Sequence, residues 1–272
     1  MNINSSLNSM GALNNLSKSI FNANLAMLKI ATGQRINKAG DDAAGLAISE
    51  RMSALTRGYN AAARNAEDGS SVIQVADGAL NATQSGLQRM RELAVQASND
   101  TLSDSDRSII QNEYNAISQE LDRSAAQTEF NTQKLLDGSF TNKTLHLGAN
   151  SDENMTVSIS DMSSSGLGLT GTDLSTRAGA NSALEQIDAA IEQVSTVRGE
   201  LGAIDNRLGY SYNNLQVASI NTTAAESRIR DSVTSKEIMN QTTQSLLMQS
   251  SLAMLAQSNK NASNILFLLG GR

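Results

Sequence analysis

The chain has 272 residues and a formal net charge of -6, and it contains neither cysteine, tryptophan nor proline. This acidic balance, without a cluster of lysines and arginines, argues against a nucleic-acid binder, because neutralising phosphates needs clustered positive charge. Without cysteine there are no disulfides or thiolate metal sites, and a single histidine leaves little for zinc binding or catalysis. Aromatic residues make up only 3% of the chain, which favours thin helix-on-helix packing over a thick globular core.

The N-terminal segment combines an unusual composition with a helical pattern. Residues 1–35 are rich in Asn and Ser, yet apolar residues recur at mostly helical spacing. Because Asn and Ser compete for backbone hydrogen bonds, we expect an amphipathic helix that is frayed until it packs. The segment lacks the basic start and apolar run of a secretory signal, and no stretch reaches the ~18 apolar residues of a membrane span. Export would therefore need a route without a cleaved signal peptide.

A glycine-bounded run, GQRINKAGDDAAG at residues 33–45, separates this helix from a second one. We expect the run to be a connector, with Asp41 and Asp42 as helix-starting acids. Two heptad stripes then predict a long helix over about residues 43–97. The stripes are Ile48, Leu55, Ala62, Gly69, Ala76, Thr83, Met90 and Ala97, and Met52, Tyr59, Ala66, Ile73, Leu80, Leu87 and Ala94.

A near capping box at Ser103–Asp106 starts a third helix, which is expected to end near Gln127 and to fold back antiparallel on the second. Its inward residues are predicted to be Ile110, Tyr114, Ile117 and Leu121. Period-two alternation at 145–147 and 155–159, around the turn-forming GANSDEN, predicts a short β-hairpin. Residues 163–176 are interpreted as a flexible loop.

The longest pattern in the chain lies between residues 187 and 229. One heptad position holds Ile187, Val194, Leu201, Leu208 and Leu215, and only a serine and a threonine interrupt the stripes. The pattern predicts one helix of roughly 65 Å at about 1.5 Å per residue. Its stripes match those of residues 48–97, which favours pairing of the two helices within one chain. Residues 245–269 again show helical spacing in a Gln-, Ser- and Asn-rich background.

Motifs that suggest chemistry are weak. GLGLTG at 166–171 matches GxGxxG, but no βαβ pattern surrounds it. The aspartates at 100, 104 and 106 lack the glycine and glutamate of a calcium loop, so helix capping is the better interpretation. His146 is expected on the solvent face of a strand, without catalytic partners. Arg89, Arg91 and Glu92 are interpreted either as a solvated charged face or as a binding site. We predict no catalytic, cofactor-binding or metal site, and no enzyme.

Several long strings resemble one family. They are TGQRINKAGDDAAGLAIS (32–49), LQRMRELAVQASN (87–99), FNTQKLLDGSF (130–140), RLGYSYNNLQ (207–216) and AMLAQSNKNASNILFLL (253–269). Together they resemble bacterial flagellin, the subunit of the flagellar filament, over nearly the whole chain. The resemblance implies a mainly α fold, an elongated antiparallel helical bundle or coiled coil with a short β-hairpin, in which the N- and C-terminal helices pair.

In detail, the resemblance implies an inner layer from residues 1–40 and 233–272, lining a narrow tube. A helical rod would comprise residues 43–177 and 178–229, with the hairpin near 140–160 and no outer variable domain. The expected function is a structural filament subunit for motility, outside the cell, exported by the flagellar type III apparatus. Expected partners are further copies of the chain, an export chaperone, and hook-associated and cap proteins, with no nucleic acid and no membrane span.

Two sets of contact residues are predicted. The marginal ends are expected to order only when neighbouring subunits bury their apolar side chains. The predicted polymerisation contacts are Ile3, Leu7, Met10, Phe21, Leu252, Leu255, Leu266 and Leu269. The resemblance also implies contact with the animal Toll-like receptor for flagellin, at Arg89, Leu93 and Glu113. The alternative function is a hook–filament junction protein of the same family, and a ligand-binding coiled coil is the second alternative.

Overall fold

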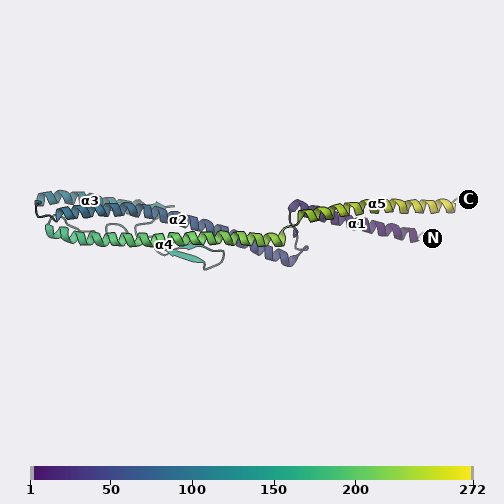
Figure 1. Cartoon of the computed structure of the whole chain (residues 1–272), viewed down its shortest axis with the longest axis horizontal. Helices are drawn as coiled ribbons and strands as arrows, with labels where there is room; N and C mark the ends of the chain where they lie inside the picture. The colour runs from purple at the N-terminus through teal and green to yellow at the C-terminus, as the bar shows by residue number, and fades with distance from the viewer. Residues whose placement is uncertain (1–2, 271–272) are drawn as a thin grey trace. The chain divides into compact units, whose positions relative to one another are not determined.

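The computed structural model describes residues 3–270 and is mainly helical (Figure 1). Its elements are α1 (Ile3–Thr32), α2 (Ala43–Ala97), α3 (Asp104–Gln127), β1 (Glu129–Phe130), β2 (Gln133–Lys134), β3 (Lys143–His146), β4 (Asn154–Val157), α4 (Arg177–Arg230) and α5 (Thr234–Gly270). The chain divides into two compact units. We call residues 1–54 with 221–272 the terminal unit and residues 55–220 the middle unit, after their places in the sequence.

In the terminal unit, α1 and α5 lie side by side and antiparallel, with the two marked chain ends at the same end of the pair (Figure 1). A short junction ties their other ends together. The Ser232 N–H donates to the Gly33 carbonyl at 2.9 Å, and the Arg35 N–H donates to the Arg230 carbonyl at 2.7 Å. Gly33 has a φ of +69°, a left-handed conformation that a glycine adopts without strain and that ends α1.

The connector between α1 and α2 shows one wrong prediction. Ile48 was expected in the buried stripe, but it is exposed, and the neighbouring Ser49 is buried instead. The reason is a close approach: a Cβ at Gly45 would lie only 2.8 Å from the buried Ile36 side chain, so small residues face inward there. Asp42 starts α2 by accepting the Gly45 N–H at 2.8 Å, as expected.

Asp41 does not start α2 as predicted. It accepts the N–H groups of Asn37 and Lys38, each at 3.0 Å, and so closes the preceding turn. These two hydrogen bonds lower the pKa of Asp41. The connector is therefore held by its own side chains, which explains why a run without helical periodicity has a defined structure.

The core of the middle unit lies among α2, α3 and α4. The stripe residues Leu80, Leu87 and Met90 of α2 and Ile187 and Val194 of α4 are fully buried, as the heptad pattern predicts. Ion pairs of Arg91 with Asp188 and of Asp77 with Arg198 mark α2 and α4 as antiparallel. From α3, the core includes Ile110, Tyr114 and Leu121.

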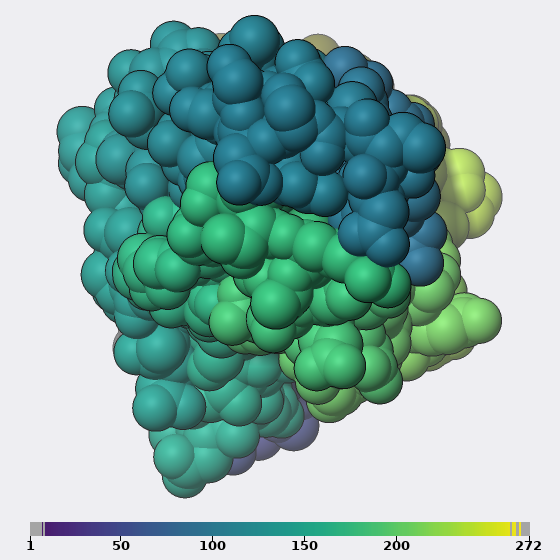
Figure 2. Space-filling view, turned by 90° about the vertical axis from the view of Figure 1, so that its left-hand side faces the viewer, coloured from purple at the N-terminus to yellow at the C-terminus, as the bar shows by residue number. Residues whose placement is uncertain are grey.

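The start of α3 has the predicted capping box, with Ser103 and Asp106 bonded reciprocally. Arg107 is buried beside it, and its guanidinium donates to the carbonyls of Ala97 and Asn99, both at 2.9 Å. These hydrogen bonds hold the end of α2 and the α2–α3 connection against the first turn of α3. Figure 2 shows that end of the unit, where the connection (blue) lies against the start of α4 (green), and Arg177 pairs there with Asp100 at 3.0 Å.

The predicted hairpin is present as β3 and β4, which pair antiparallel with Leu145 opposite Met155. A second, smaller hairpin, β1–β2, was not predicted. The segment at 163–176, interpreted as a flexible loop, is packed instead. Its Leu167, Leu169 and Leu174 are buried, and the N–H and hydroxyl of Ser164 donate to Asp122 at 2.8 and 2.9 Å. The prediction of a mainly helical fold with paired terminal helices and a short hairpin is confirmed.

Candidate functional site

The face of α1 that packs on α5 is made mostly of small and polar residues. Buried and half-buried positions follow a heptad spacing of three and four residues along the helix. The stripe at this spacing is Ser9, Ala12, Leu16, Ser19, Ala23, Ala26 and Ile30, and Leu25 and Lys29 beside it are also half-buried. Small side chains at such positions let two helix backbones approach closely, so the stripe supplies contact with little apolar area.

The matching face of α5 has the same character. Its described buried and half-buried positions at heptad spacing are Glu237, Gln241, Gln244, Met248, Ser251, Leu255 and Ser258, and Ser245 beside them is also half-buried. Together the two stripes form what we call the terminal seam. Among the side chains that the structure describes on α1 and α5, the half-buried large apolar ones are Leu16, Leu25, Ile30, Met248 and Leu255. The described part of the seam therefore buries little apolar area for two long helices and stabilises the pair weakly.

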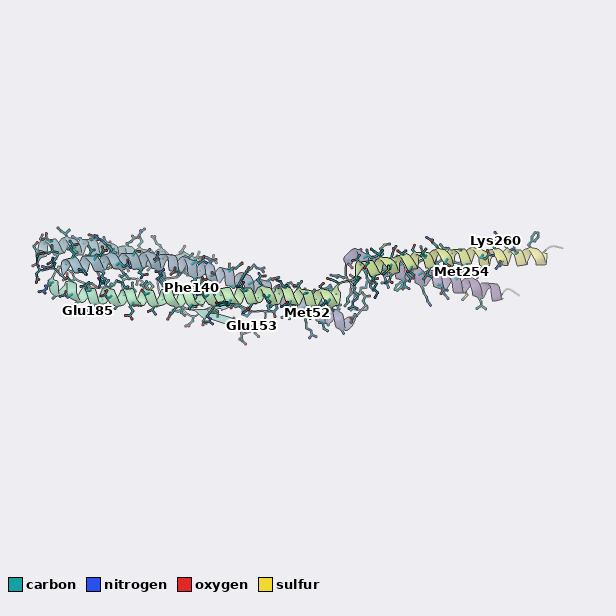
Figure 3. All side chains as sticks on the ribbon, viewed as in Figure 1. Met52, Phe140, Glu153, Glu185, Met254 and Lys260 are labelled. Atoms are coloured by element: carbon teal, nitrogen blue, oxygen red, sulfur yellow. The ribbon has the colours of Figure 1, made fainter. Side chains whose placement is uncertain are left out.

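Most of the large apolar side chains that the structure describes on these two helices are exposed, and Met254 of α5, labelled in Figure 3, is one of them. On α1 the exposed ones are Leu7, Met10, Leu13, Ile20, Phe21, Met27 and Leu28, and on α5 they are Ile238, Met239, Leu246, Leu247, Leu252, Met254 and Phe267. We call these residues the apolar face. Exposed apolar side chains in such number mark a surface that is covered in the working state of a protein.

Charges on the two helices are sparse. Lys18 and Lys29 on α1, and Lys236, Glu237 and Lys260 on α5, are the charged residues of these elements. A helix face that stays in water normally carries many charged side chains. The low charge and the exposed apolar residues are therefore unlike those of a helix pair whose whole surface stays in water.

The predicted polymerisation residues divide into three groups. Leu7, Met10, Phe21 and Leu252 belong to the exposed apolar face. Leu255 is half-buried in the terminal seam. The side chains of Ile3, Leu266 and Leu269 lie outside the described residues. Met27 and Met239 are exposed apolar residues of the same two helices that the predicted set does not include.

The second predicted site lies on the exposed surface of α2 and α3. The Arg89 guanidinium donates through Nε and Nη2 to Oε1 of Glu113 at 3.0 and 2.7 Å, and through Nη1 to Glu92 at 2.8 Å. These hydrogen bonds raise the pKa of Arg89. Leu93 is buried, with 1% of its surface exposed. It therefore belongs to the core of the middle unit and does not form part of the exposed surface with Arg89 and Glu113.

The remaining motifs of the sequence, which are the three aspartates, the GxGxxG match and His146, have structural contacts. The aspartates at 100, 104 and 106 each have a separate partner, Arg177, Arg107 and Ser103, so they do not converge. The glycine-rich stretch at 166–171 packs by its two leucines. His146 is exposed on β3, and its Nδ1 lies 2.7 Å from Oδ1 of Asn154. Within residues 3–270, acidic and histidine side chains form no group of three that could hold a metal ion.

None of the helices in the described part of the chain is both long and apolar enough to cross a membrane.

Comparison with known proteins gives consistent matches at both ends of the chain. Residues 3–141 match the model of the bacterial flagellin N-terminal helical region, and residues 184–269 match that of the C-terminal helical region. The chain is 45% identical over 271 residues to flagellin of Halalkalibacterium halodurans, covering 99% of this chain and 100% of the relative. It is 41% identical over 303 residues to flagellin of Bacillus subtilis, with 99% and 100% coverage.

Solved structures agree. The crystal structure of Bacillus cereus flagellin matches with a TM-score of 0.51 and 32% identity, over 56% of this chain and 88% of that one. A putative flagellar hook-associated protein from Vibrio parahaemolyticus matches with a TM-score of 0.55 over 70% of this chain and 100% of that one. Its 16% identity shows a shared fold alone.

Proposed function

We propose that this chain, which belongs to the bacterial flagellin family, polymerises through the apolar face of α1 and α5. As a flagellin it is a structural, non-enzymatic subunit of the flagellar filament. The observation that carries the proposed contact is the division of residues in the terminal unit. Among the described side chains, most of those that pair α1 with α5 are small or polar, while most of the large apolar ones are exposed.

The mechanism is coupled ordering and assembly. A weak seam leaves the two helices marginally stable by themselves, since isolated helices gain most of their stability from packing. When neighbouring copies cover the apolar face, its burial supplies the missing free energy and offsets the entropy lost on ordering. Residues 1–40 and 233–272 would then form the inner layer of the tube, and the middle unit would belong to the rod outside it.

Deletion of residues 236–272 tests this mechanism. The deletion removes nearly all of α5 but none of the middle unit. We expect a helical monomer that does not polymerise when it is seeded with filament fragments, while the full chain does. Long filaments of the truncated chain, seen by electron microscopy, would refute the coupled mechanism.

The same seeded assay separates a filament subunit from a junction protein. A subunit elongates the seeds without limit, whereas a junction protein adds in small numbers and stops. We expect unlimited elongation, because the relatives of full coverage are flagellins.

We further propose that the subunit leaves the cell through the flagellar export apparatus with a chaperone, and meets hook-associated and cap proteins outside. The support is the family and the exposed apolar face, which needs protection before assembly. A pull-down with the full chain and each flagellar protein of the same bacterium tests this. Binding to none of them would contradict it.

We also propose that Arg89 and Glu113 form a contact for the animal Toll-like receptor. Arg89 and Glu113 offer exposed charges, while Leu93, the third residue of the predicted set, belongs to the buried core and would act only through the packing of α2. Arg89→Ala should lower signalling in receptor-bearing reporter cells. Arg123→Ala, which removes a comparable exposed ion pair with Glu120 on α3, is the matched control and should signal normally. Equal signalling by both variants would exclude this site.

A further inference from the structure

The exposure of methionine side chains differs between the two units, although Met52 and Met248 of the terminal unit are half-buried. Four methionines of α1 and α5, which we call the terminal methionines, expose between 52 and 64% of their surface; they are Met10, Met27, Met239 and Met254. In the middle unit, Met90 and Met162 are fully buried and Met155 is 8% exposed. Met254 can be seen on α5 in Figure 3.

The terminal methionines also fall at two levels of the helix pair. Gly33 and Ser232 lie opposite each other at the junction. Met27 lies six residues before Gly33 and Met239 seven residues after Ser232, while Met10 and Met254 lie 23 and 22 residues away. Since both helices rise equally per residue, each level holds one methionine from each helix. The two levels are about 22–26 Å apart along the pair.

The chemistry of these side chains differs from that of the other apolar residues around them. The chain contains no cysteine, so the methionine thioethers are its readily oxidised sulfur atoms. A peroxide transfers one oxygen atom to the thioether: the O–O bond breaks, the sulfur is oxidised to the sulfoxide, and the peroxide is reduced to water. The product is polar, and it disrupts an interface that requires an apolar side chain.

We propose that the terminal methionines are an oxidation site that controls assembly, at which peroxide converts a free subunit into one that no longer polymerises. The proposal rests on the polymerisation surface proposed above. In the free subunit the four sulfurs are accessible, whereas in the polymer neighbouring copies cover them. Oxidation therefore acts before assembly and leaves the finished filament untouched. Methionine sulfoxide reductases, which return the thioether at the expense of two thiol electrons, reverse the block.

The expected size of the effect follows from burying a sulfoxide without a hydrogen-bond partner. One such group in each subunit should raise the critical concentration for seeded polymerisation roughly tenfold or more. Several oxidised methionines in the same subunit should abolish polymerisation at ordinary concentrations.

The test uses the purified full chain and dilute hydrogen peroxide. Peptide mass spectrometry should find the terminal methionines oxidised well before Met90, Met155 and Met162. Seeded polymerisation of the treated monomer, followed by sedimentation, should be lost and should return after treatment with both classes of sulfoxide reductase. Preformed filaments given the same peroxide should gain far less sulfoxide at these positions.

A variant with all four terminal methionines replaced by leucine supplies the matched control. Leucine keeps the volume and apolar character, so untreated polymerisation should be retained. The variant should polymerise equally well after peroxide. Loss of polymerisation by the peroxide-treated variant, or normal polymerisation by the oxidised natural chain, would overturn the proposal.

Failure of the untreated natural chain to polymerise would instead refute the proposed function, and this inference with it. Rapid oxidation of the terminal methionines within filaments would refute the statement that neighbouring copies cover them. Each of these results is distinguishable from the others, because the untreated, oxidised and reduced samples come from one preparation.

Discussion

Phe21→Ala is the sharpest perturbation of the apolar face, because Phe21 is its largest residue on α1. Its side chain is 64% exposed in the subunit. Complete burial of a phenylalanine is worth about 1.5–3 kcal/mol, so covering the exposed part is worth about 1–2 kcal/mol. At about 1.4 kcal/mol for each factor of ten, the substitution should raise the critical concentration roughly 5- to 25-fold.

The assay is sedimentation of seeded polymer over a series of subunit concentrations, with circular dichroism of the monomer in parallel. Asn22→Ala, at the next residue of the same helix, is the matched control, since Asn22 is exposed and polar. It should leave the critical concentration unchanged. Neither substitution should lower the unfolding temperature of the monomer by more than about 2 °C, because surface substitutions rarely cost more than about 0.5 kcal/mol. An unchanged critical concentration for Phe21→Ala would refute our account of the apolar face.

Two further predictions concern the middle unit. Arg107→Ala should lower the free energy of unfolding by about 2–4 kcal/mol in urea titration, because two carbonyls lose their buried donor. The exposed Arg123→Ala should cost less than about 0.5 kcal/mol, and equal losses would contradict this reasoning. Hydrogen bonds from Ser103 lower the pKa of Asp106 below its ordinary value of 3.8. A lowered folded-state pKa stabilises the fold at pH values above the ordinary pKa. In thermal unfolding, the advantage of the natural chain over Asp106→Asn should therefore begin to fall near pH 3.8 and be lost as the pH falls through the lower folded-state pKa, and a constant difference would argue against it.

The helices of the middle unit could be predicted because local pattern and final packing agree there. Along α4, Ile187, Val194 and Leu201 recur every seven residues and are all buried. The capping box at Ser103 likewise depends only on nearby residues. Where burial is decided by a distant partner, prediction was weaker: Ile48 is exposed because the connector residue Ile36 packs closely at Gly45.

The terminal helices show why an apolar pattern alone does not identify the contact it makes. The spacing of Leu7, Met10 and Phe21 predicted a helix correctly, yet these residues do not face α5. Under the proposed function, these exposed apolar residues would contact neighbouring copies. The α1–α5 contact could have been predicted from the stripe through Ala12 and Ser19. The residues of this stripe have low hydrophobicity, but their heptad spacing is regular.

Two further elements could not be predicted for local reasons. The β1–β2 turn at Asn131 and Thr132 has φ values of 48° and 65°, and it lacks the glycine that usually marks such turns. The packed segment at 163–176 has the Ser- and Gly-rich composition of a flexible loop. The segment is ordered because its three leucines are buried and because Ser164 donates to Asp122 on α3. Asp122 lies outside the segment, so the composition of the segment alone does not predict this contact.

The central claim is that the terminal seam holds α1 and α5 together within one subunit while the apolar face contacts other subunits. Cryo-electron microscopy of the assembled polymer tests it most directly. We predict that Ser19 and Ser251 remain in an α1–α5 seam, and that Leu7, Phe21 and Leu252 contact neighbouring copies. A polymer in which these three side chains face solvent, or in which α1 has left α5, would contradict the claim.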